Sequence, residues 1–128
     1  YYRDVCEPVG QLYYGCCEAM DRKIDILRKR FKNLRKIGVT PWADPHLAAE
    51  NMGSDFVCAA KPNPAFVAMP QFRPEQVEQE IARYCEACKA NGTTVEFVLK
   101  DISTIANNPE NLTQWAATVE ATIDKYYA

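Results

Sequence analysis

The chain has 128 residues, of which 48% are hydrophobic and 25% are charged, and its formal net charge is −2 at pH 7. This length suits one domain, residues 1–128, with a sizeable core, and the composition excludes a disordered chain. The slightly acidic balance excludes the basic footprint of a nucleic-acid-binding protein, and no apolar run reaches the roughly 18 residues of a membrane span.

The first ten residues, YYRDVCEPVG, contain neither an initiator Met nor a signal peptide, so we expect a piece of a longer protein. Residues 11–16 (QLYYGC) are apolar and aromatic, which is typical of a strand. Apolar residues then recur every three or four positions, which predicts a helix over 18–34 with this buried face: Ile24, Leu27, Phe31 and Leu34. We interpret the six cations of 28–36 (RKRFKNLRK) as its solvated face.

A short buried strand, KIGVT (36–40), precedes a helix with clear start and stop signals. Asp44 is a natural N-cap, Pro45 suits the first helical position, and Gly53 suits the left-handed position after the helix. Residues 55–60 (DFVCAA) form the third expected strand. The proline-rich segment 61–72 (KPNPAFVAMPQF) is an expected loop.

The carboxy-terminal part repeats the alternation. A helix is expected from Pro74 to the Asn91-Gly92 pair, and residues 94–99 (TVEFVL) form the fourth strand. A last helix follows Asn108-Pro109 with this buried stripe: Leu112, Trp115, Ala116, Val119 and Ile123. Two N-x-[ST] tripeptides, at 91–93 and 111–113, carry no weight because such tripeptides often arise by chance.

Strands that alternate with helices predict an α/β fold with a parallel sheet and right-handed crossovers. Four parallel βα units are half of a (β/α)8 barrel, and an open four-stranded parallel sheet is the competing architecture. A half barrel exposes two parallel edges and much of its inner face. We therefore expect a partner: a missing amino-terminal half-barrel, or a homo-oligomer such as a dimer.

The six cysteines could form disulfides: Cys6, Cys16, Cys17, Cys58, Cys85 and Cys88. A domain of this size needs no covalent cross-links, and the spacings are not those of a small secreted scaffold, so we expect reduced thiols and a cytoplasmic location. Cys85 and Cys88 form a C-x-x-C inside an expected helix. Redox pairs of this kind lie at helix starts, so we interpret these two as core packing.

Functional residues of parallel βα folds gather at the carboxyl ends of the strands. Two polar segments, KPNP (61–64) and LKDIST (99–104), follow expected strands there. A Lys and an Asp at such a place could bind a carboxylated substrate, supply a metal oxygen, or pair with each other. For a small-molecule substrate we predict catalytic roles for Lys61, Lys100 and Asp101, and substrate contacts from Trp42, Asn63 and Ser103.

The segment LYYGCCEAM (12–20) places Cys16, Cys17 and Glu18 where the first strand ends. Buried packing, a disulfide, or a reactive or metal-binding edge are the three interpretations. Successive strand residues face opposite ways, so one thiol should face the site and the other should pack under a helix. His46, the only histidine, follows the helix start at Asp44 and is either a ligand or base, or a surface residue.

Four segments resemble the carboxy-terminal half of proteins in the uroporphyrinogen decarboxylase superfamily: YYGCCEAMDRKIDILRK, LRKIGVTPWADPHLAAENMG, KPNPAFVA, and VEFVLKDIST followed by NPENLTQWA. That superfamily includes methylcobalamin:coenzyme M methyltransferases and related corrinoid-linked enzymes. The resemblance covers nearly the whole chain and is greatest to a poorly characterised branch. It implies a (β/α)8 barrel with its site at the carboxyl ends of the strands.

Methyltransferases of this superfamily bind zinc through a His-x-Cys pair and a later Cys. Here Tyr14 stands at the His position, Cys16 matches the first Cys, and Asp101 follows the last strand without a Cys. The resemblance thus implies Cys16 as the thiol at the site and a zinc ligand, where zinc would activate a thiol substrate. Glu18 and His46 are further metal candidates.

The expected function is part of a uroporphyrinogen decarboxylase-like enzyme. Corrinoid-linked methyl transfer, with the corrinoid on a partner protein, is favoured over lyase chemistry of the decarboxylase type, whose family members are metal-free. The alternative is a non-catalytic βα half-barrel module that assembles with a partner half or with itself.

Overall fold

The computed structural model describes residues 2–128. Its strands are β1 (Leu12–Tyr14), β2 (Leu34–Val39), β3 (Val57–Ala60) and β4 (Thr94–Phe97). Its helices are α1 (Tyr2–Cys6), α2 (Ile24–Arg30), α3 (Pro45–Met52), α4 (Pro74–Ala90) and α5 (Glu110–Tyr127), with a 3-10 helix η1 (Pro64–Ala68).

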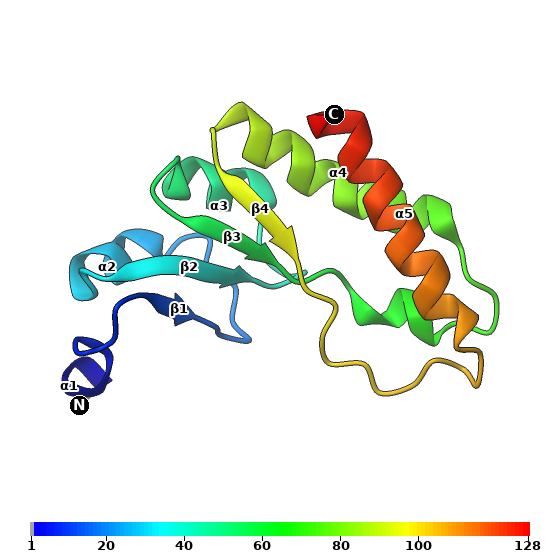
Figure 1. Ribbon diagram of the computed structural model, residues 1–128, viewed down its shortest axis with the longest axis horizontal. Coiled ribbons are helices and arrows are strands. Elements are labelled where there is room, and N and C mark those ends of the chain that lie inside the picture. Colours follow the sequence, from blue (N-terminus) through cyan, green and yellow to red (C-terminus); the bar gives the residue numbers. More distant parts are fainter. Residues whose placement is uncertain (1) are drawn as a thin grey trace.

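The four strands form one parallel sheet in the order β1-β2-β3-β4, with β1 and β4 at its two edges (Figure 1). The sheet does not close on itself, and its four parallel βα units are consistent with half of a βα barrel. The predicted α/β class and the predicted four parallel units are therefore confirmed. Each strand delivers its following loop to the same end of the sheet, which is what brings distant polar segments together.

One face of the sheet packs against helices. Tyr14, Ile37, Cys58 and Val95 are register partners across the four strands and contribute to this side. They meet buried residues of the helices, namely Ile24 and Leu27 of α2, Ala48, Ala49 and Met52 of α3, and Tyr84 and Cys88 of α4. A second cluster joins η1, α4 and α5: Val67, Val77, Ile81, Cys85, Trp115 and Val119. Helix α5 therefore packs on α4 and η1.

The start of α3 agrees with its sequence signals. The Asp44 carboxylate accepts a hydrogen bond from the backbone N–H of His46 at 2.9 Å, and Pro45 is the first helical residue. After the end of α3, Gly53 has the expected positive φ of 54°, but its ψ of −144° is not that of the predicted left-handed helical conformation. An N-cap carboxylate satisfies a backbone donor that has no partner inside the helix. This places the loop after β2, with Trp42, directly above the end of the sheet.

Several boundaries differ from the prediction. Strand β2 covers 34–39 rather than 36–40, β3 covers 57–60 rather than 55–60, and β4 ends at Phe97 rather than at residue 99. Strand β1 ends at Tyr14, two residues early, and α2 covers only residues 24–30. Phe31 has extended backbone angles and Leu34 is buried in β2, so the apolar period that suggested a longer helix continues into a strand. Within the predicted 61–72 loop, the Asn63 side chain caps η1, which a proline begins.

All six cysteines are free thiols, as predicted, and Cys85 and Cys88 are both buried. They face different clusters, since Cys85 packs with α5 and Cys88 with the sheet. The C-x-x-C motif thus contributes to packing. Within residues 2–128, no helix combines the length and the apolar character that crossing a bilayer requires.

Candidate functional site

A cavity of about 130 Å³ lies at the carboxyl ends of the four strands. Every strand contributes the residues that follow it: Cys16 and Cys17 after β1, Thr40 to Trp42 after β2, Lys61, Pro62 and Pro64 after β3, and Lys100 and Asp101 after β4. Five predicted site residues therefore meet here: Cys16, Trp42, Lys61, Lys100 and Asp101. Because a cavity of about 150 Å³ holds a benzene ring, this one has room for at most a group of about that size.

Lys61 is the deepest charged group of this cavity, with only 6% of its surface exposed. Its Nζ donates a hydrogen bond to the backbone oxygen of Cys16 at 3.1 Å. Among the residues that the structure describes, no carboxylate lies within ion-pair distance of this ammonium. Lysines are rarely buried without a partner, because removing the charge from water is costly. The fold therefore presents a buried positive charge to the cavity.

Gly38 of β2 provides the space for Lys61. A Cβ at position 38 would lie 2.8 Å from the lysine Nζ and 3.0 Å from its Cε, too close for either atom. A Cβ at Gly15 would lie 3.9 Å from the same Nζ. The lysine thus lies across the sheet over a strand without a side chain at that point. This role of Gly38 was not predicted from the sequence, although a glycine inside a strand signals a close approach of another group.

The sheet face opposite the helices is polar below this cavity. Lys36 of β2 reaches over β3 to Glu96 of β4, with its Nζ 2.9 Å from both carboxylate oxygens. The same Nζ lies 5.3 Å from the centre of the Tyr13 ring. Burial, followed by the charge of Glu96, raises the pKa of the Tyr13 hydroxyl, so this group stays protonated at neutral pH. A sheet face with these charged side chains is suited to contact water or polar ligands rather than to pack in an apolar core.

Lys100 and Asp101 form an ion pair of 3.1 Å at the mouth of the cavity. The hydrogen bond with Asp101 raises the pKa of Lys100, which keeps the ammonium charged. Asp101 has φ 59°, in the left-handed region that Asp tolerates better than most residues. Exposed ion pairs contribute little to stability, so either partner can exchange the other for a ligand group.

Both thiols of the Cys16-Cys17 pair line the cavity. The predicted alternation of the two side chains does not hold, because β1 ends at Tyr14 and neither cysteine belongs to a strand. Cys16 is partly buried against the core, and its Sγ accepts a hydrogen bond from the Glu18 N–H at 3.4 Å. Cys17 is exposed. A special role for Cys16 stays a prediction.

Four predicted site residues lie away from the cavity lining. Glu18 pairs with Lys23 in an exposed ion pair, and that hydrogen bond lowers the pKa of the carboxyl. His46 is exposed in the first turn of α3, and Ser103 is exposed in the loop before α5. The Asn63 side chain accepts a hydrogen bond from the Ala65 N–H at 3.0 Å and so caps η1.

Across residues 2–128, no three His, Cys, Asp or Glu side chains gather in a group that could hold a metal ion. Cys16 meets neither Glu18 nor His46 in such a group. The described residues thus bring no set of ligands to Cys16 like the four that hold structural zinc. Zinc at Cys16 stays a prediction from the resemblance.

Glu80 of α4 lies behind the cavity and was not predicted from the sequence as part of the candidate site. Its carboxylate accepts hydrogen bonds from the Asn63 N–H at 3.1 and 3.2 Å and so anchors the loop that carries Lys61. Burial raises the pKa of Glu80, and the hydrogen bond from Asn63 offsets part of that rise. Glu80 is thus a positioning group behind the cavity.

The raised pKa of Glu80 predicts a pH dependence. The folded chain binds this proton more tightly than the unfolded chain, so stability is fully present below the ordinary carboxyl pKa and falls as pH rises through the folded pKa. We expect Glu80→Gln to be stabilised relative to wild type by an amount that grows between about pH 4 and pH 7. Urea unfolding across this range measures it. The exposed Glu50→Gln should change nothing, and a pH-independent Glu80→Gln difference would contradict the assignment.

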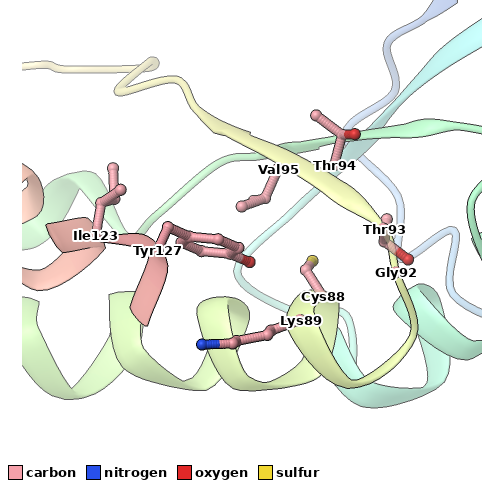
Figure 2. Close-up of a pocket in the computed structure, with 8 residues that line it drawn as sticks. All are labelled: Cys88, Lys89, Gly92, Thr93, Thr94, Val95, Ile123 and Tyr127. Atoms are coloured by element: carbon pink, nitrogen blue, oxygen red, sulfur yellow. The ribbon is translucent and has the colours of Figure 1, made fainter. Parts of the chain in front are cut away.

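A larger cavity of about 450 Å³ lies at the other end of the sheet, between β4, the end of α4 and the end of α5 (Figure 2). Cys88, Thr93 and Tyr127 line it, but none of the predicted site residues does. The Thr93 hydroxyl already donates to the Ala49 carbonyl at 3.2 Å, and Lys89 donates to the Tyr126 carbonyl. The predicted site residues that line a cavity gather at the carboxyl ends of the strands instead.

Comparison with protein-family models, with curated proteins and with solved structures finds no match to this chain. The resemblance to the uroporphyrinogen decarboxylase superfamily accordingly stays a prediction from the sequence.

Proposed function

We propose that this chain is the carboxy-terminal portion of a uroporphyrinogen decarboxylase-like enzyme that binds a small anionic substrate, or the anionic arm of a larger one, at the carboxyl ends of its strands. The buried ammonium of Lys61 is the observation that carries this proposal. A cation that the protein itself leaves without a counter-ion attracts a ligand of opposite charge.

Each residue of the cavity has a distinct part in this proposal. Lys61 holds the anionic group, Trp42 forms an apolar wall, and Lys100 with Asp101 stands at the mouth. Lys100 is a source of positive charge, and Asp101 is a carboxylate that can accept a proton once a ligand separates the pair. Corrinoid-linked methyl transfer, with the corrinoid on a partner protein, is included in this proposal only because the sequence resembles that superfamily.

A second candidate is the non-catalytic module, and the two open edges of the sheet favour it. Such a module would bind a partner half or a second copy and would leave the chemistry to the assembly. The two candidates make different predictions for activity. An assembly with an amino-terminal half should turn over substrate and lose turnover with Asp101→Asn if the first candidate holds.

The anion site is tested by titrating the chain with acetate and malonate and following Trp42 fluorescence in a Trp115→Phe background. We expect saturable binding that Gly38→Ala weakens about tenfold, because the added Cβ displaces the Lys61 ammonium. Gly10→Ala is the matched control, since a Cβ there meets nothing within 4 Å. An unsaturable response, or equal affinity for Gly38→Ala and wild type, would refute the site.

A further inference from the structure

An apolar groove runs along the free edge of the sheet, between β4 and α5. Two adjoining hollows of about 450 and 330 Å³ form it, and both are lined by Val95 and Ile123. Phe97 and Val119 add apolar surface, whereas Glu120 and Asp124 of α5 line the second hollow with negative charge. Figure 1 shows β4 as the outermost strand on this side.

The backbone of β4 is open to a further strand. The N–H of Val98 donates to the carbonyl of Ala60 in β3, so residues 94, 96 and 98 direct their polar groups to β3. By the alternation of a strand, Val95 and Phe97 direct theirs to the free edge. An edge with unpaired donors and acceptors is a template for another strand.

The opposite edge of the sheet, at β1, is also apolar but carries positive rather than negative charge. A hollow of about 540 Å³ beside β1 is lined by Leu12, Tyr14 and Phe31, with Arg30 of α2 among its lining residues. Ile26, one helical turn before Arg30, is 63% exposed. Among the side chains that the structure describes, those of residues 4–128, neither Arg30 nor the acids at the other edge have an ion-pair partner.

We propose that these two edges are one self-association surface, with β1 of one copy adding in parallel to β4 of a second copy. The contact joins the apolar groove to the apolar β1 edge and sets Arg30 against Glu120 and Asp124. Charge complementarity selects a second copy, since the partner must supply a short apolar strand followed by a basic helix. Helix α2, which follows β1 in this chain, ends in the three cations Arg28, Lys29 and Arg30. This surface rests on the second candidate function, assembly with a second copy, and does not depend on the proposed anion site.

The contact is heterologous, because different surfaces meet, and such contacts close only if the rotation between copies completes a ring. Two copies related by a half turn would make the contact twice and join eight parallel strands. Both open edges would then be paired, and the polar face of each sheet would line a common interior. The cavities with Lys61 would open at the same end of this assembly.

Sedimentation velocity of the 128-residue chain between about 1 and 100 µM tests the surface. We expect a dimer that Arg30→Glu or Glu120→Arg alone weakens about tenfold, and that the double variant restores because the charges are exchanged across the contact. Glu50→Arg on the exposed face of α3 is the charge-reversal control and should leave the dimer unchanged. A chain that stays monomeric, or a dimer that ignores these reversals, would overturn the proposal.

Val95→Pro gives an independent measurement. Proline removes the N–H that points to the free edge and keeps the pairing with β3, so the monomer should fold and the dimer should be lost. Circular dichroism verifies folding of each variant before sedimentation. A folded Val95→Pro chain that dimerises as wild type would show that β4 is not the contact strand.

Discussion

Replacing Lys61 with methionine is expected to raise the free energy of unfolding by about 1 kcal/mol and to abolish binding of a small anion. The ammonium is buried without a carboxylate partner among the described residues, and a methionine of similar length fills its space without the cost of a buried charge. Only the hydrogen bond to the Cys16 carbonyl is lost. Urea unfolding and Trp42 fluorescence titration measure the two effects on the same protein.

Lys36→Met is the matched control, because Lys36 is paired with Glu96 and lies on the same face of the sheet. It should lower the free energy of unfolding or leave it unchanged, and it should retain anion binding. A Lys61→Met chain that is less stable than wild type would show that the lysine serves the fold. If the Lys61→Met chain also bound the anion as tightly as wild type, the proposed anion site would be refuted.

Replacing Asn111 with alanine is expected to lower the free energy of unfolding by about 3 kcal/mol. This side chain is fully buried at the start of α5. Its amide nitrogen donates to the carbonyls of Val67 and Met69 at 3.0 Å and to that of Ile105 at 3.3 Å. Alanine would leave three carbonyls without this donor and a void beside them. Equilibrium unfolding in urea measures the loss.

The control for Asn111 is Gln114→Ala, an exposed position in the same helix, which should change stability by less than about 0.5 kcal/mol. An Asn111→Ala chain as stable as this control would show that solvent replaces the three hydrogen bonds. Asn111 is also the first residue of an N-x-T tripeptide, and its burial makes it an unsuitable glycan acceptor in the folded chain.

Most of the fold could be predicted from local signals. The cap at Asp44, the proline at the start of α4, and the apolar spacing of α4 and α5 each agree with an element of the structure. In the predicted buried stripe of α5, however, Ala116 is exposed, and Asn111 and Thr122 are buried instead. Helix α2 was predicted too long because the apolar spacing that places Leu27 under the helix continues at Leu34, which is buried in a strand. The buried positions of helix α2 and of strand β2 both carry apolar residues. The spacing of apolar residues alone therefore could not show where the helix ends and the strand begins.

That Cys16, Lys61 and Asp101 would lie near one another was also predictable, because parallel strands bring their carboxyl ends to one edge whatever the side chains are. The burial and the hydrogen-bond partners of each side chain were not predictable. The burial of Lys61 depends on Gly38 in a neighbouring strand, and the role of Asn63 depends on Glu80 in α4. Contacts between segments far apart in the chain decide these roles, and no local pattern encodes them.

The bridge from Lys36 to Glu96 passes over β3, where Ala59 is the register partner of Glu96. Two side chains can meet across an intervening strand only if that strand carries a small side chain between them. A bulky side chain at position 59 would separate the Lys36 ammonium from the Glu96 carboxylate. Both groups would then be solvated by bulk water instead of by each other. We therefore expect a library randomised at this codon to recover almost only glycine, alanine and serine among well-folded clones.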